Sequence, residues 1–315
     1  MFRAIPSLVL AAAAGALYAG NLQLDGHIAG DVHTRSLRVT LFSVERPYAE
    51  STDVDPRGDF HFHNLAPGNY TVAVVRPGLG EVRRTVVISS AVAGDSGVVH
   101  ATIPYSSAEA AANPNGGTVS VQQASIPRHA AAKYAEAQRR LAGRDPEGAV
   151  RSLEEAVSIA PEYSAAWNAL GVIAFQNGDG SRAQTFFRRS LEADPAAYEP
   201  LVNLGGVLLK AGSAADALEF NQRAVHDRPE DALANAQLGM NYFTLGRFEE
   251  AEPCLLAAKR LDRAHFSQPQ VFLAEIYARR GNRRAAIREL EDVLEVRPDG
   301  PLSDSIRRNL AHLAQ

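Results

Sequence analysis

WNALGVIAFQNGDGSRAQTFFRRSLEADP, residues 167–195, decides the fold of the larger part of this chain of 315 residues. Its key residue types return every 34 residues in both directions along the sequence. Self-similarity at this period is typical of stacked helix pairs, in which each pair needs its neighbours to bury its apolar face. The returning residues are the alanines at 149, 183, 217, 251 and 286, the glycines at 178, 212, 246 and 281, and the prolines at 161, 195, 229 and 298.

About five copies of this unit fit between residues 127 and 300, and each predicts two antiparallel helices. In the clearest copy, Gly171 and Ala183 are small enough for two helices to cross closely, and Pro195 ends the second helix. This pattern, Trp-x-x-Leu-Gly, then Ala-x-x-x-Phe, then Pro, resembles the tetratricopeptide repeat. The resemblance implies an all-α solenoid whose inner, concave side binds peptides.

Residues 20–104 follow a different period. Short runs rich in Val, Thr, Tyr and Phe alternate in polarity between Gly, Pro, Asn and Asp, which is typical of an all-β sandwich. Phe60 and Phe62 share one face of such a run, so we expect both in the core. The predicted strands are Leu22–Ile28, Ser36–Ser43, Asp59–His63, Tyr70–Val75, Val82–Ile88 and Val98–Ile103.

One hairpin in this half, GDFHFHNLAPGNYTV at residues 58–72, is more specific. It resembles the hallmark hairpin of carboxypeptidase-regulatory-like (transthyretin-like) domains. The resemblance implies a sandwich of seven strands, grouped with carbohydrate-binding-like folds, that is accessory and carries no catalytic residues. Glycan binding by this half is therefore the alternative function, with Tyr48, Tyr70 and Tyr105 as the aromatic side chains on which a sugar ring would stack.

The N-terminus has the pattern of an export signal. Arg3 precedes an apolar stretch without charges from Leu8 to Ala19, and small residues predict cleavage after Ala16 or Ala19. The stretch is shorter than the ~20 apolar residues of a spanning helix, so retention as a membrane anchor is the less favoured alternative. We expect an exported protein of the periplasm or cell envelope, or a secreted one, with no integral membrane span after cleavage.

Composition and motifs exclude several classes of function. The net charge of -4 gives no basic footprint for nucleic acid. A single cysteine, Cys254, rules out a disulfide framework or a thiolate metal cluster, and we expect its thiol to be buried and inert. His61 and His63 could together hold a metal ion, but a pair of solvated hairpin histidines is the favoured interpretation. We expect no enzyme, no cofactor and no metal, because no nucleophile, acid–base pair or phosphate loop is present.

The candidate site is therefore a surface. The first helix of each repeat packs one stripe on its neighbours and turns another, at spacings i, i+4, i+7 and i+8, to the inner side. The resemblance implies that this stripe binds a protein or peptide partner, and its apolar centre suits an amphipathic helix or a hydrophobic segment. The alternative is that the same side chains fill space inside the protein. The predicted residues are Asn168, Val172, Phe175, Gln176, Val202, Leu209, Lys210, Met240, Phe243, Thr244 and Glu275.

The sequence thus predicts a multidomain protein, an all-β sandwich followed by an all-α solenoid. Its predicted function is that of an exported, non-enzymatic scaffold. After Pro301 we expect one more helix, with Ile306, Leu310 and Leu313 on one face, that caps the solenoid. The predicted parts are a signal segment at 1–19, the sandwich at 20–104, a linker at 105–126, the solenoid at 127–300 and the cap at 301–315.

Overall fold

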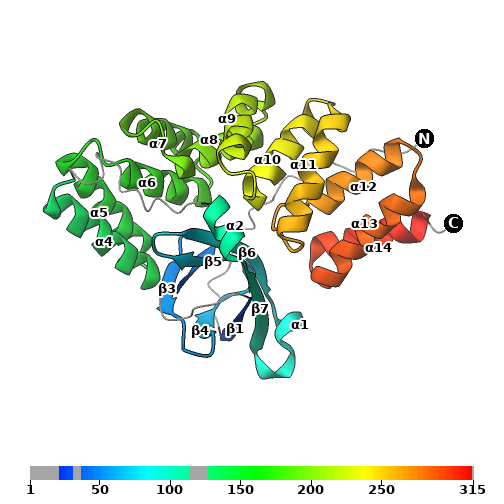
Figure 1. The fold of residues 1–315 in the computed structure, drawn as a ribbon, viewed down its shortest axis with the longest axis horizontal. Helices are drawn as coiled ribbons and strands as arrows, with labels where there is room; N and C mark the ends of the chain where they lie inside the picture. Colours follow the sequence, from blue (N-terminus) through cyan, green and yellow to red (C-terminus); the bar gives the residue numbers. More distant parts are fainter. Residues whose placement is uncertain (1–20, 31–36, 114–125, 314–315) are drawn as a thin grey trace.

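The computed structural model describes residues 21–30, 37–113 and 126–313, and it places a β domain inside an arc of helices (Figure 1). The predicted signal segment lies outside the described residues. None of the helices in the described ranges has both the length and the apolar composition that crossing a bilayer requires.

The β domain has two sheets around one core. A sheet with the order β4-β1-β7 packs against a sheet with the order β3-β2-β5-β6, and β1 and β7 are parallel while the other pairs are antiparallel. Phe60 and Phe62 are both 1% exposed, as predicted. A Cβ added to Gly26 would lie 2.0 Å from the Phe60 ring, so only glycine fits there. The strands are β1 (Leu22–Gly30), β2 (Arg38–Ser43), β3 (Ala49–Asp53), β4 (Asp59–Leu65), β5 (Gly68–Arg76), β6 (Gly80–Ile88) and β7 (Val98–Tyr105).

Two elements of this half differ from the prediction. Strand β3 was not predicted, because four of its five residues, AESTD, are polar and none of them is buried. The segment predicted to be a linker begins as folded structure, since β7 runs to Tyr105 and helix α2 (Ser107–Ala112) follows it. Gly80 lets α2 approach β6, because a Cβ there would lie 1.8 Å from the Ala110 carbonyl oxygen. A short helix, α1 (Ser90–Ala93), and a 3-10 turn (Gly94–Ser96) connect β6 to β7.

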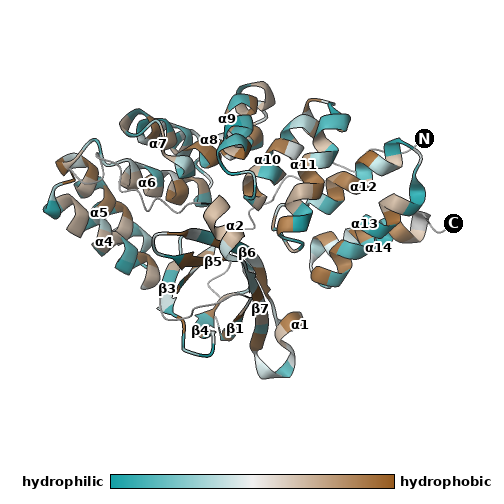
Figure 2. Ribbon diagram, viewed as in Figure 1, coloured by the Kyte–Doolittle hydropathy of each residue, from teal (hydrophilic) through white to brown (hydrophobic). Residues whose placement is uncertain are grey.

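The second half consists of five helix pairs, as predicted. Apolar and hydrophilic residues alternate along each helix (Figure 2), which suits helices that pack on one side only. Gly171 marks a close crossing, because a Cβ there would lie 2.4 Å from the Phe187 ring. The pairs are α4 (Arg128–Ala142) with α5 (Pro146–Ile159), α6 (Ser164–Gln176) with α7 (Gly180–Ala193), α8 (Tyr198–Lys210) with α9 (Ala214–Asp227), α10 (Ala232–Thr244) with α11 (Phe248–Leu261), and α12 (Pro269–Arg279) with α13 (Arg283–Val296).

A last helix, α14 (Pro301–Leu313), follows the fifth pair. Ile306 is buried against Leu290 and Val293 of α13, and Leu310 packs beside it. Both residues lie on the face that the sequence predicts to cap the solenoid.

Candidate partner-binding surface

The inner side of the solenoid is in contact with the chain's own β domain (Figure 1). At one end of this contact, the Gln176 side chain at the end of α6 donates to the Ser43 carbonyl oxygen over 2.9 Å. Next to it, Arg144 of the turn between α4 and α5 donates to the Asn64 carbonyl oxygen and lies 5.8 Å from the centre of the Tyr48 ring. The β domain is therefore held from the first repeat onward.

Three residues at one position of successive repeats make the contact farther along. Arg228, Asp262 and Arg297 follow the last residues of α9, α11 and α13, and all three are buried. We call them the docking row. Arg228 Nη1 lies 3.7 Å from a Glu81 carboxylate oxygen, Asp262 accepts from the Thr85 backbone N–H over 2.8 Å, and Arg297 donates to Asn69 Oδ1.

A group of paired charges lies at the centre of this contact. Arg83 of β6 donates to both carboxylate oxygens of Glu199 in α8, over 2.9 and 3.2 Å. Its guanidinium also lies 2.6 Å from Glu81. Arg228 joins the group, because it lies 3.4 Å from Glu199 and stacks 3.7 Å above the Tyr198 ring.

The electrostatics of this group follow from burial and pairing. Burial alone would raise the pKa of the Glu199 carboxyl, but the guanidinium groups of Arg83 and Arg228 outweigh it and hold this pKa below its ordinary value. Burial would lower the pKa of Arg83, but the carboxylates of Glu199 and Glu81 raise it well above the ordinary value. For Glu81 burial dominates and raises the pKa of its carboxyl. The contact therefore favours charged Glu199 and Arg83 over their neutral forms.

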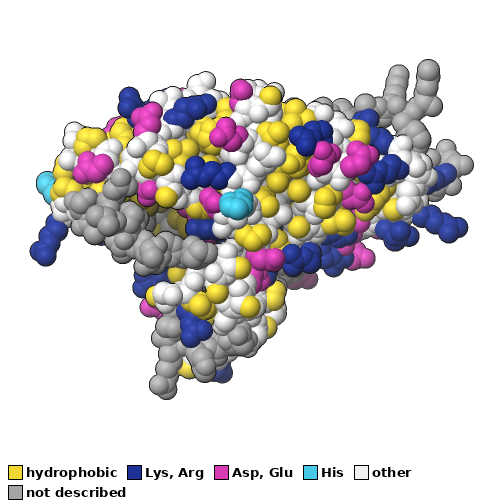
Figure 3. Space-filling model, turned by 45° about the horizontal axis from the view of Figure 1, so that its top comes forward, with side chains coloured by type: hydrophobic (Ala, Val, Ile, Leu, Met, Phe, Trp, Pro, Cys, Tyr) yellow, Lys and Arg dark blue, Asp and Glu magenta, His cyan; other side chains and the backbone are white. Residues whose placement is uncertain are grey.

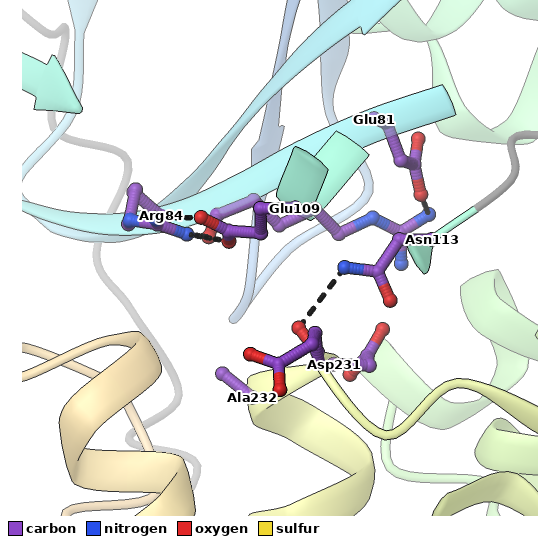
Figure 4. Close-up of a pocket in the computed structure, with 8 residues that line it drawn as sticks. Glu81, Arg84, Glu109, Asn113, Asp231 and Ala232 are labelled. Atoms are coloured by element: carbon purple, nitrogen blue, oxygen red, sulfur yellow. Dashed lines mark hydrogen bonds and ion pairs between the residues drawn. The ribbon is translucent and has the colours of Figure 1, made fainter. Parts of the chain in front are cut away.

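The cavity at this junction is small. It has a volume of about 10 Å³, which is room for one water molecule at most. Its polar groups face one another rather than an open space (Figure 4), as Asn113 donates to the Glu230 carbonyl oxygen over 3.0 Å and Arg84 donates to Glu109 over 2.7 and 2.8 Å. This cavity therefore offers no room for an organic ligand, and its polar groups join the two domains.

The residues predicted for the partner site fall into three groups. Gln176 contacts the β domain. Val202 is 2% exposed, so it lies in the core and offers no surface to a partner. The remaining residues are half-buried or exposed: Asn168, Val172, Phe175, Leu209, Lys210, Met240, Phe243, Thr244 and Glu275.

Several of this third group already have neighbours. Asn168 accepts from Asn203 over 2.9 Å, and the Glu275 carboxylate lies 2.9 Å from Arg279. Phe243 packs between Phe248 and Phe272, with ring centres 5.4 and 5.2 Å away. Val172, Leu209 and Met240 pack at the margins of buried clusters, and the Lys210 ammonium lies 4.4 Å above the Phe175 ring.

Lys210 and Thr244 are the most exposed of the third group. Each lies at the repeat position of Gln176, 34 and 68 residues farther along the chain.

The side chains named for the alternative functions of the β domain can be placed within the described residues. Tyr48, Tyr70 and Tyr105 are 9%, 4% and 4% exposed, so none of the three offers a ring face to a sugar. His61 is exposed and pairs with Asp25 over 2.9 Å, and His63 is exposed beside it. Within residues 21–30, 37–113 and 126–313, no three His, Cys, Asp or Glu side chains are grouped closely enough to hold a metal ion.

The sequence interpretation missed Glu199 and the docking row. One signal was present, because Arg228, Asp262 and Arg297 recur at intervals of 34 and 35 residues, directly before Pro229, Arg263 and Pro298. A charged residue that recurs at a buried position of a repeat needs a partner. Here the partners belong to the other domain.

Comparison with known proteins defines the class of the helical half. Residues 134–198 and 175–232 match one family model of the tetratricopeptide repeat, and residues 232–265 match another. The chain is therefore a multidomain protein in which a β domain precedes a tetratricopeptide-repeat solenoid.

Charges of both signs are interspersed over the face of the molecule drawn in Figure 3, without a patch of one sign.

Among known proteins, the chain is similar to the cell division cycle protein 16 homologs of Homo sapiens and Mus musculus. It is 35% identical to each over 112 residues, which is 33% of this chain and 18% of the relative. The chain thus matches less than a fifth of the length of these curated relatives. It also resembles the crystal structure of PilW, a type IV pilus biogenesis factor, with a TM-score of 0.51 and 22% identity over 59% of this chain and 87% of that one. At this identity the likeness to PilW concerns the fold alone.

Proposed function

We propose that the chain is an exported, non-enzymatic scaffold that binds a protein or peptide partner on the inner side of its solenoid. The tetratricopeptide repeats support a role in protein binding. The observation that carries the position of the site is the exposure of Lys210 and Thr244 at the repeat position of Gln176. Gln176 touches the β domain, so its equivalents in the next two repeats face the same side and are accessible to a second protein.

The proposed surface is mixed in character. Lys210 supplies a positive charge over the Phe175 ring, Leu209 packs on the same cluster as Phe175, and Met240 is half-buried. A partner that covers this surface would bury apolar area at its centre, and the ammonium of Lys210 would favour a carboxylate at its edge.

A photo-reactive amino acid placed at position 210 or 244 tests the surface in cells. We expect cross-links to one partner from both positions. Glu219 is a matched control, because it is exposed on α9, which lies on the outer side of the arc (Figure 1). Cross-links from position 219 to the same protein would contradict the proposed site. We expect Lys210→Glu to lower capture about tenfold, the effect of losing ~1.4 kcal/mol of binding free energy.

Export is part of the proposal and rests on the pattern of residues 1–19. Cell fractionation and mass spectrometry of the mature N-terminus check it. A chain in the envelope fraction that begins after Ala16 or Ala19 is the expected result, and an intact N-terminus in the cytosolic fraction would contradict it.

A further inference from the structure

Strand β6 is an edge strand that the solenoid covers. Within its sheet, β6 pairs with β5 on one side. On the other side, the Glu81 N–H donates to the Asn113 carbonyl oxygen over 3.1 Å, and the Thr85 N–H donates to Asp262 over 2.8 Å. An uncovered strand edge pairs readily with other extended segments. In this protein, α2 with the residue that follows it and the solenoid cover the edge of β6.

Three solenoid residues contact alternate residues of β6 in order. Arg228 lies against Glu81, Glu199 accepts both bonds of the Arg83 guanidinium, and Asp262 accepts the Thr85 N–H. Alternate residues of a strand share one side, so contacts at i, i+2 and i+4 match an extended backbone and no helix. We call Glu199, Arg228 and Asp262 the strand-binding site.

The chemistry of this site is selective. A carboxylate that receives two parallel N–H bonds from a guanidinium selects arginine over lysine. Arg228 requires a negative charge two residues before that arginine, and Asp262 requires a free backbone N–H two residues after it. These demands describe an extended segment with the pattern acid-x-Arg-x, and β6 meets them with Glu81 and Arg83.

The junction has the properties of an interface that can separate. Its contacts are largely polar and charged, as in interfaces between domains that move. The Nε atoms of Arg83 and Arg297 and the Oδ1 atom of Asn113 are buried without a hydrogen-bond partner within the described residues. Burial removes the hydrogen bonds of these atoms to water, and the junction does not replace them. Separation of the domains would restore these hydrogen bonds.

We propose that β6 occupies, in cis, a site that also binds partner segments in an extended conformation with the pattern acid-x-Arg-x. The partner takes the strand-binding site when the β domain moves away from the solenoid. The inference rests on the proposed function, to which it adds a second region of the solenoid and the chemistry of the segment that binds there.

The test opens the junction in the full-length chain and leaves the strand-binding site intact. Arg83→Glu places a third carboxylate beside Glu199 and Glu81, and the double variant Arg83→Glu with Glu199→Arg restores a pair of opposite charges. Small-angle X-ray scattering should give a larger radius of gyration for Arg83→Glu, and the wild-type value for the double variant. Circular dichroism checks that each variant is folded.

Binding is then measured with a fluorescein-labelled peptide of the sequence of Gly80–Ile88, by fluorescence anisotropy. We expect the Arg83→Glu chain to bind this peptide at least about tenfold more tightly than the wild-type chain, because β6 no longer competes for the site. A peptide in which the residue corresponding to Arg83 is glutamate should bind the opened chain at least about tenfold more weakly than the native peptide. Glu81→Lys, which faces Arg228 with a like charge, opens the junction independently and should give the same result.

Equal binding to the opened and wild-type chains, equal binding of the two peptides, or no binding to either opened chain would overturn the proposal. So would an unchanged radius of gyration in both charge-reversal variants, because these charges would then not hold the β domain in place. Cross-linking at positions 210 and 244 is independent of these results. A failure of the strand-binding site therefore differs from a failure of the proposed partner surface.

Discussion

The two halves of the molecule bury their apolar residues in different ways. The β domain has one core, in which side chains from both sheets, together with Ala110 of α2, form a single cluster. The solenoid has five smaller clusters, each built by neighbouring helix pairs. In a stack of repeats, stability is close to a sum of local terms, whereas one closed core is gained or lost as a unit. A core substitution in the β domain should therefore destabilise the whole domain. A core substitution in the solenoid should destabilise only the repeats next to it.

The largest expected effect comes from Phe60→Ala. Phe60 is 1% exposed in the sandwich core, and the loss of a buried phenylalanine of this kind costs about 3–5 kcal/mol. We expect hydrogen exchange of the backbone amides to rise in β1, β4 and β7, and in the opposite sheet as well. The free energy of unfolding of the β domain is measured by urea titration of the full chain.

Phe187→Ala is the matched change in the solenoid, because Phe187 is also 1% exposed. Its local cost should be similar, but the rise in hydrogen exchange should be confined to α6, α7, α8 and α9, whose residues share its cluster. Comparable spread of the two effects would contradict the difference between the two halves.

A smaller effect is expected at the helix crossing of a single repeat. In Gly171→Ala the new Cβ would lie 2.4 Å from the Phe187 ring, and overpacking of this kind costs about 1–3 kcal/mol. Gly180→Ala is the control, because a Cβ there meets nothing within 4 Å. This control should be neutral or should stabilise the chain by up to about 1 kcal/mol. Equal losses of unfolding free energy in the two variants would show that crowding at the crossing is not the cause.

Sequence pattern predicted the elements that repeat or alternate. The 34-residue period predicted five helix pairs, and alternation predicted six of the seven strands in the described residues. Strand β3 was missed because it is a polar edge strand without a buried face. Helix α2 was missed because Ala110 is buried by its contact with β6 and not by a local apolar pattern.

The candidate site was less predictable, because it depends on how the two halves meet. Position within the repeat aligns Lys210 and Thr244 with Gln176, but it cannot show that Gln176 touches Ser43, 133 residues earlier in the chain. The pairing of Arg83 with Glu199 likewise joins residues 116 positions apart. Each partner taken alone has the pattern of an ordinary surface charge.

The smallest expected effect is a dependence on pH that belongs to the solenoid. His265 follows α11 beside the docking row and is 4% exposed, whereas His27, His61, His63 and His100 of the β domain are exposed. Burial lowers the pKa of His265 below its ordinary value, against the opposing charges of Asp262 and Asp231. Below a pH of about 6.5 the unfolded chain therefore takes up a proton that the folded chain resists.

This difference in proton uptake sets the direction in which the stability of the solenoid changes with pH. Well above pH 6.5 His265 is neutral in both states and contributes no slope, and as the pH falls toward 5 the unfolded state is increasingly favoured. Urea titrations at pH 7 and pH 5 should therefore show a loss of solenoid stability in the wild-type chain that is smaller in His265→Gln. Burial raises the pKa of Glu81, so protonation of Glu81 favours the folded state as the pH falls. This contribution is present in both proteins and cancels when their stabilities are compared. An equal loss in the two chains would show that protons bound elsewhere cause the dependence on pH.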